Sequence, residues 1–238
     1  MTSARPFLTA RWRHLALLNY EVDPSLVRPL VPPGTEMDTM DGKNYVSLVG
    51  FMFLDTRVRG WAIPFHRNFE EVNLRIYVRR KAEEGWRRGV TFVKEIVPRA
   101  AIAWVARTVY GENYVALPMS HRWSAEDPPS VRYAWRSGGR EMSIELEPEG
   151  PYRPITAASP EEFIAEHYWG YTAPRRGETV EYRVEHPRWR IASARKSAWE
   201  GDAAALYGPA FASVLAGRPA SAFLAEGSEV AVHEGTRI

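Results

Sequence analysis

Four polar side chains alternate along one predicted strand in a pattern suited to acid–base chemistry. Glu71, Asn73, Arg75 and Tyr77 occupy every second position of segment 70–79, so they share one face of that strand. Inside a barrel, Arg75 would bind a carboxylate and Glu71 would act as a general acid or base. Alternation by itself favours the other interpretation, a solvated sheet face with cross-strand ion pairs.

Lys94 is flanked closely by apolar strand residues, unlike the other lysines of the chain. A buried amine at this position would be a nucleophile able to form a Schiff base. The ordinary alternative is an ion pair with an acid on the neighbouring strand, such as Glu70 or Glu71. Strict alternation puts Glu95 on the opposite face, so no pair with that residue is expected.

Three further candidates belong to the segment 98–114. Arg107 is a charged residue in an otherwise apolar helix, and it requires a partner: a ligand, an interior carboxylate or a surface position. Tyr110 and Tyr114 bracket Gly111 and are candidates to close a pocket and donate a phenol hydrogen bond. The alternative for both tyrosines is ordinary core packing.

No metal or cofactor motif is present. The six histidines show no HxH, HxxxH or HExxH spacing, and the chain has no cysteine. It also lacks GxGxxG, P-loop and GxSxG patterns. We therefore predict no metal site, no cofactor and no hydrolase elbow.

The elements that must position these residues form a strand–strand–helix–strand unit. Segments 70–79 and 90–97 are predicted to pair as a hairpin. Pro98 suits the first turn of a helix, Gly111 suits its end, and 114–119 returns as a strand. The helix is apolar nearly all round, which predicts that it is buried.

The rest of the chain predicts an α+β fold dominated by antiparallel strands. Hairpins are expected at 131–147 and around Pro187, and helices are expected after Asp23 and Ser159, each followed by proline. So many hairpins require closure or a double layer to hide the strand edges. No linker or repeat interrupts residues 1–238, which predicts a single domain.

Composition narrows the classes of partner. The 238 residues include 31 basic and 29 acidic ones, a net charge of +2, which argues against a dedicated nucleic-acid binder. Recurring arginine–tryptophan pairs are better explained by intramolecular stacking. No secretory signal or membrane-length apolar segment is visible, and cysteine is absent, so we expect a cytoplasmic protein that does not enter membranes.

Four segments together resemble a known bacterial family. They read WRHLALLNYEVDPSLVRPLVPPG, YVSLVGFMF, FEEVNLRIYV and GVTFVKEIVPRAAIAWVARTVYGENYVALPM. These are similar to the YqjF-like proteins, an uncharacterised family related to acetoacetate decarboxylase, over residues 7–225. The resemblance implies a barrel or cone of antiparallel strands with a few helices and a pocket inside. Relatives commonly form homo-oligomers, although no pattern in this sequence predicts one.

The resemblance also shows what this chain lacks. Acetoacetate decarboxylases use a Schiff-base lysine beside a second lysine, and Tyr114 and Val115 stand at those positions here. Glu71 corresponds to a pocket glutamate of the family, and Arg13, eleven residues before Pro24, corresponds to its pocket arginine. A Schiff base requires a primary amine, so the usual decarboxylase mechanism is not expected.

These observations predict a small-molecule-binding barrel. The expected ligand is a small organic acid or a hydrophobic carboxylate held by Arg13, Arg75 or Arg107, with Tyr110 nearby. Catalysis of a lyase or isomerase type would use Glu71 and Tyr114. Two alternatives stay open: a ligand-binding or sensor module without turnover, and a structural protein whose interior is filled by residues such as Phe51 and Phe92.

Overall fold

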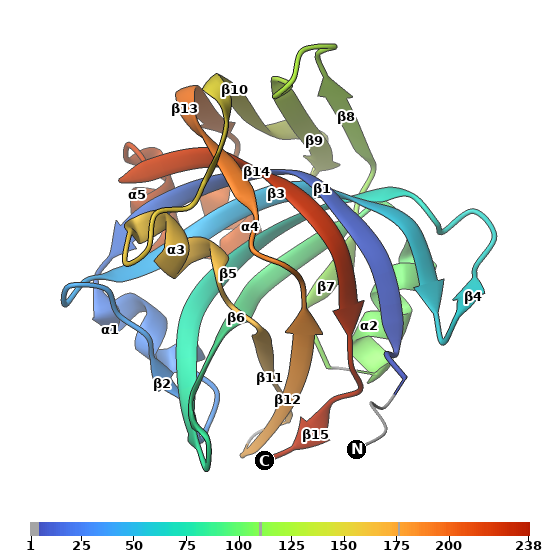
Figure 1. Ribbon diagram of the computed structural model, residues 1–238, viewed down its shortest axis with the longest axis vertical. Coiled ribbons are helices and arrows are strands. Elements are labelled where there is room, and N and C mark those ends of the chain that lie inside the picture. The colour runs from blue at the N-terminus through green and yellow to red at the C-terminus, as the bar shows by residue number, and fades with distance from the viewer. Residues whose placement is uncertain (1–4, 110, 176) are drawn as a thin grey trace.

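Antiparallel strands dominate the computed structural model, which describes residues 5–109, 111–175 and 177–238, with the side chains of 105–109 and 175 outside the description. The strands form one continuous sheet in which an extra pairing, between β12 and β14, joins two distant strands into a ring (Figure 1). The strands of the ring are β1 (Leu8–Val22), β3 (Asn44–Val58), β5 (Phe69–Ala82), β6 (Gly85–Val97), β11 (Trp169–Arg175), β12 (Glu178–Glu185) and β14 (Ser221–Val232). The predicted α+β fold with an antiparallel barrel is thereby confirmed.

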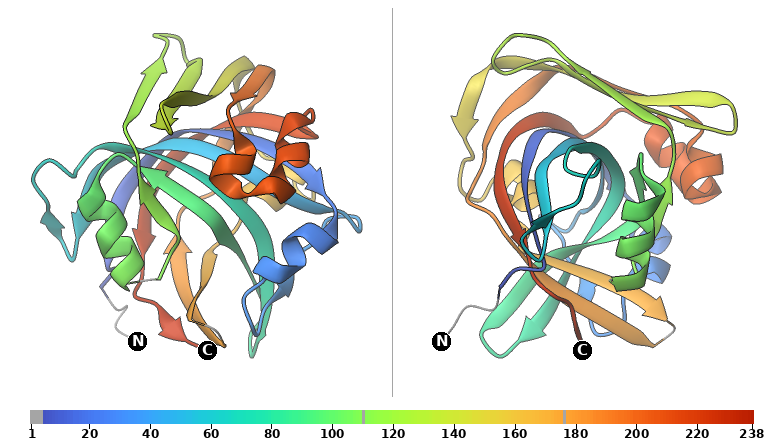
Figure 2. Two further views of the ribbon diagram at one scale, coloured as in Figure 1. Left: turned by 180° about the vertical axis from the view of Figure 1, so that it is seen from behind. Right: turned by 90° about the vertical axis from the view of Figure 1, so that its right-hand side faces the viewer.

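A second layer continues the sheet from β14 and covers one side of the ring (Figure 2). Its strands are β13 (Arg190–Glu200), β10 (Arg140–Pro154), β9 (Val131–Ser137) and β8 (Met119–Trp123). Short strands complete the sheet, namely β2 (Glu36–Met37), β4 (Trp61–Ala62), β7 (Tyr114–Ala116) and β15 (Thr236–Arg237). This layer hides ring strands that would otherwise present their apolar faces to water.

Helices occupy the ends and the outside of the ring. They are α1 (Pro24–Val27), a 3-10 turn (Arg28–Leu30), α2 (Ala100–Val109), α3 (Pro160–Ala165), α4 (Ala203–Tyr207) and α5 (Pro209–Ala216). The side chain of Asp23 accepts a hydrogen bond from the Ser25 backbone, and that of Ser159 accepts one from Glu162. Both caps precede a proline, as predicted. No helix in the described residues is long and apolar enough to cross a membrane.

Two expectations about local structure are wrong. Trp104 of α2 is 63% exposed, because the helix lies at the end of the ring and packs through one side only, where Ala103 is buried. Strands β12 and β13 also do not form a hairpin around Pro187, because each of them pairs with β14 instead. The segment between the two strands therefore crosses from one part of the sheet to another.

The two faces of β5 contribute to two separate cores. Val72, Leu74 and Ile76 point outward and pack with Tyr133 and Trp135 of β9, in the cluster between ring and second layer. The inner cluster contains other aromatic and aliphatic side chains, including Phe51, Phe53, Phe69 and Phe163. The alternate residues of β5 consequently face the inside of the ring.

Candidate functional site

A cavity of about 220 Å³ lies inside the ring, and the polar face of β5 lines it. Glu71, Asn73 and Arg75 all contribute to its wall. The alternating polar residues therefore belong to an interior, and not to a solvated sheet face. Most of the remaining wall is apolar, with large contributions from Trp12, Leu15, Val49, Phe51, Phe92 and Trp189. Phe51 and Phe92 line this cavity and leave a volume of about 220 Å³ beside them.

Three glutamates from different segments meet at one end of the cavity. Glu71, Glu95 and Glu112 are 3%, 2% and 6% exposed, and all three line the cavity. Strand pairing brings them together, because Glu95 lies opposite Asn73 in the β5–β6 pair and beside Tyr114 in the β6–β7 pair. Buried carboxyl groups without cations require hydrogen-bond donors or protons.

Hydrogen bonds distinguish the three carboxyl groups. Glu71 accepts from Tyr114 Oη at 2.9 Å and from Asn73 Nδ2 at 3.0 Å, one bond on each carboxylate oxygen. Glu112 accepts from Tyr182 Oη at 2.7 Å. Glu95 lies close to Glu112 and Glu71, whose negative charges favour the protonated form of Glu95. Glu71 is therefore solvated as an ion, whereas the surroundings of Glu95 favour its protonated form.

Burial determines the proton affinity of the cluster. It raises the pKa of Glu71 to about 7 and the pKa of Glu112 to about 8. Burial, together with the neighbouring carboxylates, raises the pKa of Glu95 well above its usual value. The pKa of Tyr114 is raised for the same reasons, so its hydroxyl keeps its proton. Near neutral pH the cluster thus contains both ionised and protonated carboxyl groups, which are the components of acid–base catalysis.

Cationic and imidazole side chains line a different part of the cavity. Arg75 donates from Nη2 to the Ile164 carbonyl at 3.0 Å and from Nε to Tyr77 Oη at 3.3 Å. No carboxylate of the described residues lies within ion-pair distance of its guanidinium. His167 lines the cavity nearby, and burial lowers its pKa to about 4, so that it is neutral. Arg75 therefore has charge available for an anion.

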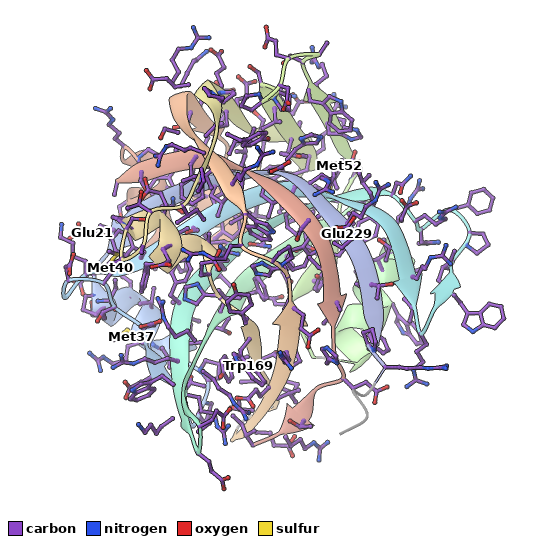
Figure 3. The ribbon with its side chains drawn as sticks, in the orientation of Figure 1. Glu21, Met37, Met40, Met52, Trp169 and Glu229 are labelled. Carbon is purple, nitrogen blue, oxygen red and sulfur yellow. The ribbon has the colours of Figure 1, made fainter. Side chains whose placement is uncertain are left out.

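Arg13 is not part of the cavity wall, contrary to the expectation that it holds the ligand. It lies 3.9 Å from Glu229, which Figure 3 labels on β14. The physical reason is a register shift of β1 between Arg13 and Ala16, where His14 adopts a positive φ of 55°. This irregularity interrupts the alternation, so that Trp12 and Leu15 line the cavity in its place.

Two predicted ligand contacts fall outside the described residues. Arg107 belongs to α2, but its side chain is outside the description, and Tyr110 is outside it altogether. Tyr114 is described, lines the cavity and contacts Glu71, as stated above. The predicted roles of Arg107 and Tyr110 stay predictions.

Lys94 occupies neither of the positions considered for it. It lies opposite Leu74, whose side chain packs in the outer core, and it is absent from the cavity wall. It also makes no ion pair with Glu70 or Glu71. All four lysines are among the described residues, and none of them lines the cavity. The lining therefore provides no amine for a Schiff base.

A bulge in β6 explains why alternation assigns Glu95 to the wrong face. Arg75 pairs with Phe92 and Leu74 pairs with Lys94, so Val93 is an extra residue in β6. This bulge places Phe92 and Glu95 on the cavity side together, although alternation puts them on opposite faces. Glu112 follows Gly111, which has a positive φ, and lies outside any strand, so alternation does not predict its orientation. Tyr182 belongs to β12, and no local pattern indicates that this distant strand reaches Glu112.

The described residues contain no group of three or more histidine, aspartate or glutamate side chains arranged to hold a metal ion. The clustered glutamates accept hydrogen bonds from tyrosine and asparagine donors. Their arrangement is therefore suited to holding protons.

Solved structures similar to this one include an acetoacetate decarboxylase, an acetoacetate decarboxylase-like enzyme and an enduracididine biosynthesis enzyme. The acetoacetate decarboxylase of Legionella pneumophila subsp. pneumophila str. Philadelphia 1 has a TM-score of 0.71 at 14% identity, covering 100% of this chain and 92% of that one. The enduracididine biosynthesis enzyme MppR complexed with pyruvate has a TM-score of 0.71 at 14% identity, with 99% and 91% covered. An acetoacetate decarboxylase-like enzyme from Sphingomonas wittichii RW1 scores 0.68 at 14% identity, with 99% and 94% covered. At these identities the similarity establishes the fold alone.

Sequence comparison identifies closer relatives. The uncharacterized protein YqjF of Bacillus subtilis (strain 168) is 29% identical over 190 residues, which cover 77% of this chain and 74% of that protein. The sequence model of the family DUF2071, described as an uncharacterized conserved protein, matches residues 9–229. The predicted YqjF-like relationship is thus confirmed, and the chain belongs to the DUF2071 family of uncharacterized conserved proteins.

Proposed function

We propose that this protein binds a small organic acid in the ring cavity and transfers protons to or from it without forming a Schiff base. The observation that carries the proposal is that Arg75 and a cluster of buried glutamates line the same cavity. Arg75 has no carboxylate partner among the described residues. The guanidinium group would bind the ligand's carboxylate. The glutamates would contact its reacting carbon or oxygen.

The hydrogen bonds suggest distinct roles for the carboxyl groups. Glu71 accepts two hydrogen bonds and is suited to act as the base. Glu95 and Glu112 have pKa values raised chiefly by burial and are suited to supply a proton to the ligand. Tyr114 orients Glu71 through its hydroxyl. The reaction class is proton transfer at a carbon or oxygen of an organic acid, as in lyases and isomerases.

Related folds give modest support for an acid as ligand. The solved structures include a protein named acetoacetate decarboxylase and one complexed with pyruvate. Acetoacetate and pyruvate are both small carboxylic acids. The cavity of about 220 Å³ is small compared with sites for drug-sized ligands, which measure roughly 300–1,000 Å³. The absence of a lysine from the cavity wall supports a different reaction from that of Schiff-base enzymes.

Solvent deuterium exchange tests the proposed chemistry. Candidate oxo and hydroxy acids would be incubated with the protein in D₂O, and loss of carbon-bound hydrogen would be followed by proton NMR. We expect exchange at one carbon, slowed on the order of 100-fold in Glu71→Gln, which keeps the size of the side chain but cannot act as a base. Equal exchange rates in the two proteins would contradict Glu71 as base. Binding without exchange would favour a ligand-binding module without turnover.

A trapping experiment tests the absence of a Schiff base. The protein would be treated with acetoacetate and borohydride, and its intact mass would be measured. We expect no adduct on the cavity-bound acid, because no lysine reaches it. An adduct that disappears in Lys94→Ala would overturn this expectation and identify Lys94 as the nucleophile.

A further inference from the structure

The two polar parts of the cavity lie far apart along one strand. Glu71 and Arg75 are four residues apart on β5, which separates their Cα atoms by about 13 Å in an extended strand. Glu71 accepts from Tyr114 and from Asn73, whereas the guanidinium of Arg75 donates to Tyr77, on the side away from Glu71, and to the Ile164 carbonyl. The carboxylate and the guanidinium are thus separated by a distance on the order of 10 Å.

The wall between these two groups is apolar on the β3 side, whereas Asn73 on β5 and Glu95 on β6 line it with polar groups. Phe51, Val49 and Phe92 lie opposite Glu71, Asn73 and Arg75 in the neighbouring strands, and each of the three lines the cavity. The apolar side of the wall favours hydrocarbon over a second charged group. A volume of about 220 Å³ corresponds to about seven water molecules, so this interval accommodates a chain of several carbons or one ring.

We propose that the ligand is an organic acid whose reacting group is separated from its carboxylate by an apolar spacer of several carbons or an aromatic ring. This inference rests on the proposed function, because it takes Arg75 as the carboxylate site and the glutamate cluster as the reacting end. An acid as short as acetoacetate, whose carbonyl is two bonds from the carboxylate carbon, reaches only one of the two ends. The spacer would lie against Val49, Phe51 and Phe92.

Two matched ligand series test the spacer by calorimetry. One series consists of straight-chain alkanoates, and the other of ω-hydroxy acids of the same chain lengths. We expect affinity to rise about fourfold per methylene in both series while the chain is buried. The ω-hydroxy acid should bind about tenfold more tightly than its alkanoate only at the length where its hydroxyl reaches the glutamates.

Variants of Arg75 separate the inference from the proposed function. Arg75→Met should weaken every acid by tenfold or more, and Arg75→Lys, which keeps the charge, should weaken it less. Arg136→Met is the control, because Arg136 is exposed and far from the cavity wall. Thermal unfolding of each variant establishes that it is folded before affinities are compared.

The possible outcomes are distinct. Acetoacetate-sized acids that bind as tightly as long ones, with the same dependence on Arg75, would overturn the spacer and leave the proposed function standing. Affinity that rises with length without any gain from the ω-hydroxyl would also overturn the spacer. Acids that bind equally to the wild type and to Arg75→Met would overturn the proposed function itself.

Discussion

The two faces of β5 differ in what they bury, and the difference separates stability from function. Outward, Val72, Leu74 and Ile76 pack among aromatic and aliphatic side chains and are at most 2% exposed. Inward, Glu71 and Asn73 are almost equally buried, but they border a cavity. Burial alone therefore does not distinguish a core residue from a site residue. The chemical type of the buried group and the empty space beside it do.

The two faces of β5 also differ in their effect on the free energy of unfolding. A buried carboxylate destabilises a fold unless it is paired, whereas a buried leucine stabilises it by about 1.5–3 kcal/mol. Packing in the outer core offsets the electrostatic cost of the inner cluster. We therefore expect the two faces to respond oppositely to substitution and to pH.

The largest expected effect comes from adjacent residues on the two faces. Leu74→Ala should lower the free energy of unfolding by about 2–5 kcal/mol, because it removes a fully buried side chain and leaves a cavity. Arg75→Met should change stability by about 1 kcal/mol or less while removing most of the affinity for organic acids. Urea unfolding and calorimetry measure the two quantities. A loss of both properties in both variants would contradict the separation.

A smaller effect is expected from pH. Glu71 and Glu112 have pKa values raised from 4.5 to about 7 and about 8, so their ionisation destabilises the fold as the pH rises. His167 has a pKa lowered from 6.5 to about 4 and acts in the opposite sense, but only below pH 6.5. Between pH 6.5 and 8 the free energy of unfolding should therefore fall by about 2 kcal/mol.

Isosteric glutamines sharpen this pH prediction. Glu112→Gln should remove much of the decrease between pH 6.5 and 8, because the amide does not ionise. Glu147→Gln is a suitable control, since Glu147 belongs to the second layer and does not line the cavity. Urea titrations at each pH provide the measurement. An unchanged slope in Glu112→Gln would mean that Glu112 does not ionise in this range.

Tyr114→Phe should cost about 1 kcal/mol of stability at pH 8, because Glu71 loses a hydrogen-bond donor to its ionised form. The cost should be smaller at pH 5, where Glu71 is protonated. Tyr152→Phe serves as a comparison, since Tyr152 lies outside the cavity wall. A cost that does not depend on pH would indicate that Tyr114 contributes packing and not charge stabilisation.

The smallest effect is expected at the end of the ring. Trp104→Ala on α2 should change the free energy of unfolding by no more than about 0.5 kcal/mol, because the side chain is 63% exposed. Thermal unfolding would detect a larger change. A loss of about 2 kcal/mol would show that Trp104 is buried in solution, for example against another molecule.

Local sequence patterns predicted the elements around the site well. Period-two alternation identified β5 and its two chemically different faces, and serine or aspartate before proline marked the starts of α1 and α3. The family resemblance predicted the ring and an internal pocket. The predictions of the strand and of the helix starts succeed because strand periodicity and capping depend on residues close together in the chain. The single-domain prediction stays a prediction.

Irregularities in β1 and β6 give individual side chains an orientation that alternation does not predict. An extra residue at Val93 turns Glu95 into the cavity, and the register shift after Arg13 turns that side chain away from it. Neither bulge has a glycine or proline to mark it in the sequence. Residue types along a single strand therefore could not identify which charged groups share the interior.

The sequence by itself determined the alternating polar face, the helix starts, the absence of cysteine and the loss of the family's lysine pair. Only the tertiary structure decided that the polar face is interior, that Glu95 and Glu112 join Glu71, and that Arg75 lacks a carboxylate partner among the described residues. The physical reason is ring closure. Raised pKa values require desolvated groups from distant strands to meet, and no local pattern encodes that meeting.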